Sequence, residues 1–139
     1  MFDEYKRFDV DKFLGEYKDN KVKLEELKGM YNSIADSMSQ STDPKVQGGA
    51  ISSQVEKRAE RRAKLEKDID YLERYFDTVE GLLDTLSPAE RIIVREYFIY
   101  GKKGERDVEL LGIKLFMSQA TCYRRIRIIR DKVRDYMRD

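Results

Sequence analysis

Apolar side chains recur at alternating intervals of four and three residues along the first part of the chain. Of all the features of the sequence, this spacing restricts the possible folds most. It is carried by Phe13, Tyr17, Leu24, Leu27, Tyr31, Ile34 and Met38, with Asn20 at the one polar position. Such a repeat places a single apolar stripe along a helix and does not fit the alternation of a strand. The pattern therefore predicts a helix over 13–38, with Asp9 or Asp11 as its N-cap.

A second stripe of the same spacing runs through residues 53–84. Its apolar positions are Val55, Leu65, Ile69, Leu72, Phe76, Val79 and Leu83. Arg58 and Arg62 occupy two of the stripe positions, so we expect the first half of this helix to face solvent or another molecule. Residues 39–54 between the stripes are rich in Ser, Thr and Gly, which indicates an exposed loop. Two such helices predict an antiparallel hairpin, although pairing between two chains in a homodimer would satisfy the same stripes.

Helix signals then continue to the end of the chain. Ser87, Pro88 and Glu90 form a capping-box sequence that predicts a helix over 88–100. We expect this helix to bury Ile92, Ile93, Tyr97 and Phe98. A short helix over 105–115 and a last helix from Ser118 to about Met137 follow. The fold class is therefore all-α: a long helical hairpin, or antiparallel coiled coil, over 1–85, and a helix-turn-helix domain over 86–139.

The residue types present exclude most catalytic and metal chemistry. The 139 residues include no histidine and a single cysteine, Cys122. Most zinc sites, Ser/His/Asp and Cys/His catalytic sets and internal disulfides are thereby excluded, and the carboxylates form no convincing catalytic pair. We therefore expect a protein that is not an enzyme and that has no metal and no cofactor. No apolar run is long enough for a membrane span or signal peptide, so a cytoplasmic location is expected.

The formal net charge of +1 conceals a polarised chain. Residues 1–100 contain 17 Lys and Arg against 21 Asp and Glu, whereas residues 101–139 contain 11 against 6. The concentration is greatest near the end, where six basic residues accompany one acid, Asp131. These basic residues are Arg124, Arg125, Arg127, Arg130, Lys132 and Arg134. Clustering of this kind is typical of a surface that binds the phosphate backbone of DNA.

The last two predicted helices have the spacing of a helix-turn-helix. Leu111 and Leu115 flank the small Gly112, where the second helix would cross the first at close range. We expect Met117 in the turn, Ser118 as the cap, and Cys122 and Ile126 in the core. The second helix would place its N-terminal residues in the major groove. The candidate DNA-binding residues are Ser118, Gln119, Ala120, Thr121, Tyr123, Arg124, Arg125, Arg127 and Arg130.

The run from Leu86 to Val133 resembles the helix-turn-helix of the sigma-70 region 4 type. Ser118 and Thr121, then Arg124 and Arg125, match the recognition helix of that family. Phe116 departs from the pattern, because a glycine is common there, and so does Lys114, where an apolar residue is usual. The order of a helical hairpin with a Gly-Gly loop, a charged helix and this domain is similar to the ArpU/RinA-type phage regulators of late genes. That resemblance implies a phage or prophage activator that binds double-stranded promoter DNA and recruits the host RNA polymerase.

The sequence therefore predicts a sequence-specific, DNA-binding transcription regulator. An alternative is a DNA-packaging assembly protein like the small subunit of phage terminases, which also combines a helix-turn-helix with a helical oligomerisation segment. In those subunits the DNA-binding part comes first in the chain, whereas here it comes last. Binding to a two-fold DNA site would require a homodimer.

Overall fold

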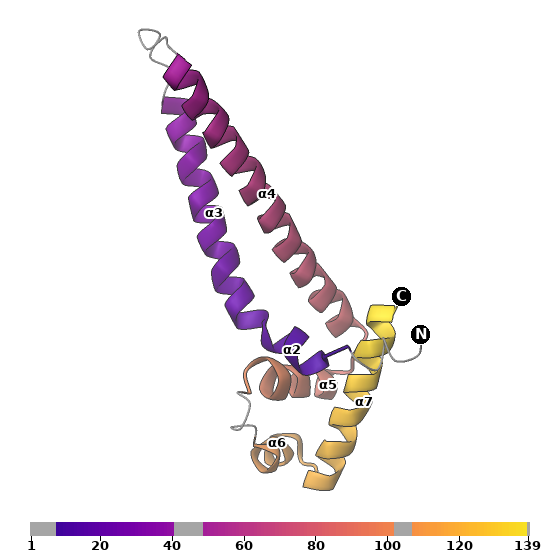
Figure 1. Ribbon diagram of the computed structural model, residues 1–139. Coiled ribbons are helices and arrows are strands. Elements are labelled where there is room, and N and C mark those ends of the chain that lie inside the picture. Colours follow the sequence, from indigo (N-terminus) through magenta and orange to yellow (C-terminus); the bar gives the residue numbers. More distant parts are fainter. Residues whose placement is uncertain (1–7, 41–48, 102–106, 139) are drawn as a thin grey trace. The chain divides into compact units, whose positions relative to one another are not determined.

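The computed structural model describes residues 8–40, 49–101 and 107–138, and within these ranges the protein is helical with no strand (Figure 1). The elements are α2 (Val10–Gly15), α3 (Tyr17–Gln40), α4 (Gly49–Asp84), α5 (Pro88–Ile93), the π-helical turn η1 (Val94–Ile99), α6 (Val108–Leu115) and α7 (Gln119–Arg138). The all-α prediction is confirmed. None of the helices in these ranges has both the length and the apolar composition that a membrane crossing needs.

The first predicted helix begins earlier than expected and is interrupted. Asp9 caps α2 by accepting a hydrogen bond from the backbone N–H of Lys12 at 3.0 Å. Glu16 then separates α2 from α3. The second predicted helix is observed as α4, which begins at Gly49 rather than near Ser53. Part of the predicted loop, residues 41–48, lies outside the described residues, as do 102–106 before α6.

The chain divides into two compact units. One, called the head below, comprises residues 8–19 and 77–138; the other, called the helix pair, comprises 20–40 and 49–76. This division differs from the boundary predicted between residues 85 and 86. The reason is that α2 contacts both η1 and α7, and its Val10 and Leu14 are buried in the head. The N-terminal residues therefore belong to the same unit as the C-terminal helices.

Within the head, α5 runs on into η1 through a π-helical turn. The predicted capping box is present, since Ser87 and Glu90 satisfy each other's backbone N–H groups. Tyr100 N–H donates to the carbonyl of Arg95 at 2.9 Å, five residues earlier instead of four. The wider turn shifts the buried face by one position. It buries Phe98 and Ile99, five residues after Ile93 and Val94, and leaves Tyr97 only half-buried. Ile93 and Phe98 are thus buried as expected, whereas Ile92, which precedes the turn, is exposed.

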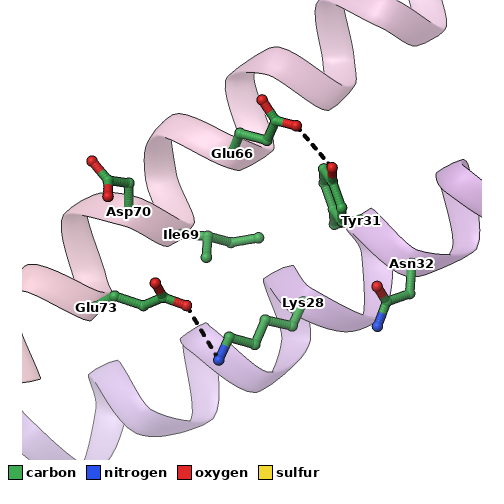
Figure 2. A pocket seen from close by; sticks show the side chains of 7 residues that line it. All are labelled: Lys28, Tyr31, Asn32, Glu66, Ile69, Asp70 and Glu73. Carbon is green, nitrogen blue, oxygen red and sulfur yellow. Dashed lines mark hydrogen bonds and ion pairs between the residues drawn. The ribbon is translucent and has the colours of Figure 1, made fainter.

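In the helix pair, α3 and α4 make contact through polar side chains. Lys28 Nζ lies 3.3 Å from Glu73 Oε1, and the Tyr31 hydroxyl donates to Glu66 Oε1 at 2.8 Å (Figure 2). The same hydroxyl accepts hydrogen bonds from Arg62. Residue numbers rise along α3 as they fall along α4, so the two helices run in opposite directions.

Candidate nucleic-acid interface

A tight turn joins α6 to α7. Asp107 caps α6 by accepting a hydrogen bond from the N–H of Leu110 at 2.9 Å. Phe116 ends α6 in the left-handed conformation with φ of 56°. The N–H of Met117 donates to the Gly112 carbonyl at 2.8 Å, which closes the helix end. Phe116 thus adopts the conformation that glycine commonly supplies at this position.

Gly112 allows α6 and the start of α7 to approach each other closely. A Cβ atom at this position would lie 2.6 Å from the carbonyl oxygen of Met117 and 3.6 Å from Cys122 Sγ. Because the nearer neighbour is a backbone atom, a larger residue would force the turn to move. This agrees with the expectation that a small residue is required here.

Ser118 fixes the beginning of α7. Its Oγ accepts a hydrogen bond from the backbone N–H of Thr121 at 3.2 Å, and its hydroxyl donates to Thr121 Oγ1 at 2.9 Å. Ser118 thus acts as the predicted N-cap. Both hydroxyl side chains are engaged with each other, which orients them at the first turn of α7.

One side of α7 packs into the head. Its buried residues are Cys122, Ile126, Ile129 and Val133, spaced by four and three. Burial raises the pKa of the Cys122 thiol, so the thiol stays protonated and unreactive at neutral pH. Cys122 and Ile126 therefore lie in the core, as the sequence predicts.

The opposite side of α7 carries most of the predicted DNA-binding residues. The exposed ones are Ser118, Gln119, Ala120, Tyr123, Arg124, Arg125 and Arg127, whereas Thr121 is half-buried. With about 100° between successive residues of a helix, Ala120, Arg124 and Arg127 lie on one side of α7 and Arg125 lies on a flank. The structure thus places Ala120, Arg124 and Arg127 together on one exposed side of α7.

The rest of the C-terminal basic cluster is neutralised by acids within the head. Lys132 Nζ lies 2.8 Å from Glu90 Oε2, and Arg134 lies 3.5 Å from Asp131. No hydrogen bond or ion pair links Arg124, Arg125 or Arg127 to any residue that the structure describes. Among the six basic residues of this cluster, those without a partner in the described part of the chain thus lie in the N-terminal half of α7, a division that the sequence did not indicate.

Arg130 is half-buried and held against the head by an acid, unlike the other predicted arginines. Its Nε and Nη2 donate to the two carboxylate oxygens of Asp11, each at 3.1 Å, and its guanidinium lies 5.6 Å from the centre of the Phe98 ring. Burial alone would lower the pKa of Arg130, but the hydrogen bonds and charge of Asp11 outweigh it and raise the pKa. The pair joins residues 119 positions apart, so no local sequence signal could have revealed it.

Glu90 holds Lys132 from a buried position. Burial alone raises the pKa of the Glu90 carboxyl, but hydrogen bonds from Lys132 and Ser87 lower it below its ordinary value. The carboxylate is therefore charged at neutral pH and compensates the ammonium of Lys132. Glu90 thus serves both as part of the cap of α5 and as an anchor for α7.

An exposed apolar stripe runs along α6 and the turn that follows it. In the sequence it comes shortly before the exposed arginines of α7. Leu110 and Ile113 are exposed, and Phe116 is 97% exposed. Leu110 and Ile113 are three apart, a spacing that puts them on neighbouring positions of one face of α6, and Phe116 follows as the left-handed residue that ends the helix. We did not predict this stripe, although the departure at Phe116 was a signal for it.

Neither a protein-family model, nor a curated protein, nor a solved structure matches this chain.

Proposed function

We propose that the head binds double-stranded DNA through the exposed surface of α7. The observation that carries this proposal is the selective pairing of the basic residues. Arg130, Lys132 and Arg134 are matched by acids of the head, whereas Arg124, Arg125 and Arg127 stand exposed on one stretch of helix. Neighbouring arginines without acidic partners repel one another, which destabilises the folded protein. The same arginines are well suited to bind the phosphates of DNA.

The arrangement supports a helix-turn-helix mode of binding. The crossing of α6 and α7 at Gly112 and the Ser118 cap leave the first turns of α7 exposed. In this mode Gln119, Ala120 and Tyr123 face base edges, and Arg124 and Arg127 contact phosphates or guanines. Arg125 lies on the flank and contacts the backbone. Ser118 and Thr121 orient the helix, and Arg130 acts from within the head by fixing α7 on Asp11.

Enrichment of genomic fragments followed by binding titrations at several salt concentrations tests this proposal. Arg124→Ala/Arg127→Ala should weaken binding by at least about tenfold, which corresponds to about 1.4 kcal/mol. If both arginines contact phosphates, the slope of log affinity against log salt should fall by about 2.

Lys21→Ala/Lys23→Ala is the matched control, because it removes the same charge from exposed positions of α3. A nonspecific effect of net charge would weaken binding equally in both variants. Equal losses, or no binding by the wild type at low ionic strength, would contradict the proposal.

We further propose, from the resemblance to ArpU/RinA-type regulators, that DNA binding serves activation of phage late genes through RNA polymerase. The exposed stripe of Leu110, Ile113 and Phe116 supports a protein contact of the head, since large apolar side chains in contact with water favour docking. Ile113→Ser/Phe116→Ser should lower activated transcription in a reporter assay while DNA affinity stays unchanged. Unchanged activated transcription in this variant would show that the stripe does not contact the polymerase.

A further inference from the structure

The direction in which the exposed arginines of α7 point depends on the rotation of this helix about its own axis. A rotation by about 100°, the angle between successive residues, would put a neighbouring residue in the place of Arg124 or Arg127. The buried stripe of α7 contributes apolar contacts, which are non-directional and define a rotation less sharply than paired charges do. The buried residues of this stripe are Cys122, Ile126, Ile129 and Val133.

Two ion pairs hold α7 at the two borders of this stripe. On one border, Arg130 Nε and Nη2 each donate to one carboxylate oxygen of Asp11, both at 3.1 Å. On the other border, Lys132 Nζ donates to Glu90 Oε1 at 3.0 Å and to Glu90 Oε2 at 2.8 Å. From the angle between successive residues, Arg130 and Lys132 lie about 80° to either side of the centre of the stripe. A rotation of α7 in either direction therefore moves both cations away from their carboxylates.

Both acids are themselves held in place by the head. Asp11 belongs to α2, whose Val10 and Leu14 are buried. Glu90 is buried and accepts a hydrogen bond from the backbone N–H of Ser87 at 3.0 Å. Each carboxylate binds its cation through both oxygens or in two hydrogen bonds, and such charge-assisted contacts are directional. Two fixed carboxylates on opposite borders thus define one rotation of α7.

We propose that Asp11 and Glu90 are positioning residues that fix the rotation of α7 and thereby direct Arg124 and Arg127 toward DNA. The part of this inference that concerns DNA rests on the proposed function. The expected effect on affinity is opposite to that of simple electrostatics. An acid near a phosphate-binding helix repels DNA, so its removal would ordinarily raise the affinity. Removal of Asp11 and Glu90 should instead lower the affinity, because α7 loses its fixed rotation.

Binding titrations of Asp11→Asn/Glu90→Gln test the sign of this effect. The two probes are a duplex enriched from genomic fragments and an unrelated duplex of the same length. The variant should bind the enriched duplex at least about tenfold more weakly than the wild type does. It should bind the unrelated duplex no more weakly than the wild type, because nonspecific binding depends on charge rather than on base contacts. A chain that is only less stable would lose affinity for both duplexes together.

Glu96→Gln/Asp131→Asn is the matched control, because it removes the same charge from acids that do not join α7 to another element. Glu96 pairs with Lys114, and Asp131 pairs with Arg134 within α7. The affinity of this control for both duplexes should equal or exceed that of the wild type. If Asp11→Asn/Glu90→Gln also raises the affinity for the enriched duplex, the two acids act by repulsion and the proposal is overturned.

The single cysteine of the chain provides a test that needs no DNA. Cys122 is fully buried on α7, so its thiol reacts with a maleimide only when the surrounding structure opens. Val79 is fully buried on α4 within the head, and Cys122→Ala/Val79→Cys moves the thiol there to report opening of the head as a whole. Asp11→Asn/Glu90→Gln should accelerate labelling of Cys122 at least about tenfold more than labelling at position 79.

The labelling rates separate the proposal from the proposed function. Preferential acceleration at Cys122 would support a local loosening of α7. Equal acceleration of both thiols would make the two acids general stabilisers of the head and would overturn the proposal, as would an unchanged rate at Cys122. If the wild type binds no DNA at low ionic strength, the proposed function fails, and labelling still decides whether Asp11 and Glu90 position α7.

Discussion

The two units of this protein bury their apolar residues to different degrees. The largest fully buried side chains, which include Phe98, Leu82, Ile93 and Ile129, all belong to the head. The most buried side chains of the helix pair are Leu72, Leu65 and Tyr75, at 4, 8 and 9% exposure. Helices from both ends of the chain enclose the core of the head, whereas the helix pair is one layer thick. A helix that packs on one side only keeps its apolar stripe available to a partner.

The largest effect should come from removing a core ring of the head. Phe98→Ala deletes a fully buried side chain on which the Arg130 guanidinium rests, and should lower the free energy of unfolding by about 3–5 kcal/mol. Leu24→Ala in the helix pair should cost about 1 kcal/mol, because that side chain is only half-buried. Urea unfolding of both variants measures the difference, and losses of equal size would contradict the comparison between the units.

Two glycines provide a sharper version of the same comparison. Gly112→Ala in the head should destabilise by about 1–3 kcal/mol, since its Cβ would clash with a backbone carbonyl. Gly29→Ala in α3 should instead stabilise by about 0.5–1 kcal/mol, because its Cβ meets nothing within 4 Å and alanine favours the helix. Thermal and urea unfolding should therefore shift in opposite directions. A loss of stability in Gly29→Ala would show that α3 is covered more closely than the structure indicates.

A third test concerns the buried ion pair of the head. The pKa of Glu90 is lowered in the folded protein. Its charge therefore stabilises the fold at pH values above the ordinary pKa of 4.5. This contribution is lost as the pH falls through the lowered pKa. Glu90→Gln should cost about 1–2 kcal/mol at neutral pH, because it weakens the hydrogen bonds with Lys132 and Ser87.

The difference in unfolding free energy between the wild type and Glu90→Gln should shrink as the pH is lowered below 4.5. Glu96→Gln serves as a control, because its pair with Lys114 is exposed and should contribute little at any pH. A constant difference between the wild type and Glu90→Gln across this range would show that the charge of Glu90 is not what anchors α7.

Local signals in the sequence predicted most elements of the fold. These signals are the periodic apolar residues and the caps at Ser87 and Ser118. Each involves residues only a few positions apart, so it can be recognised without knowledge of the tertiary structure. Two features depended on distant packing and were missed. Val10 and Leu14 join the head only because α2 meets η1 and α7, and the π-helical turn that buries Ile99 has no local signature.

The candidate interface was predicted less completely than the fold. The side of α7 that faces away from the core followed from helical spacing, so Arg124 and Arg127 were placed as expected. Which arginines remain without partners depended on acids far away in the chain, namely Asp11 for Arg130 and Glu90 for Lys132. Charge counting treats all six basic residues alike, and only the fold separates them.

The smallest effect concerns Phe116, an exposed residue of the head with a strained backbone conformation. A left-handed residue with a Cβ costs roughly 1–2 kcal/mol, and this ring, 97% exposed, recovers almost none of that by packing. Phe116→Gly should therefore stabilise the head by about 0.5–1 kcal/mol in urea unfolding, after the extra entropy of glycine in the unfolded chain is subtracted. Phe116→Ala, which keeps the Cβ, should change stability little. If Phe116→Gly gains stability and keeps its DNA affinity yet loses activated transcription, the strained phenylalanine serves a protein partner. A loss of stability in Phe116→Gly would instead mean that the ring packs against the head and is no docking surface.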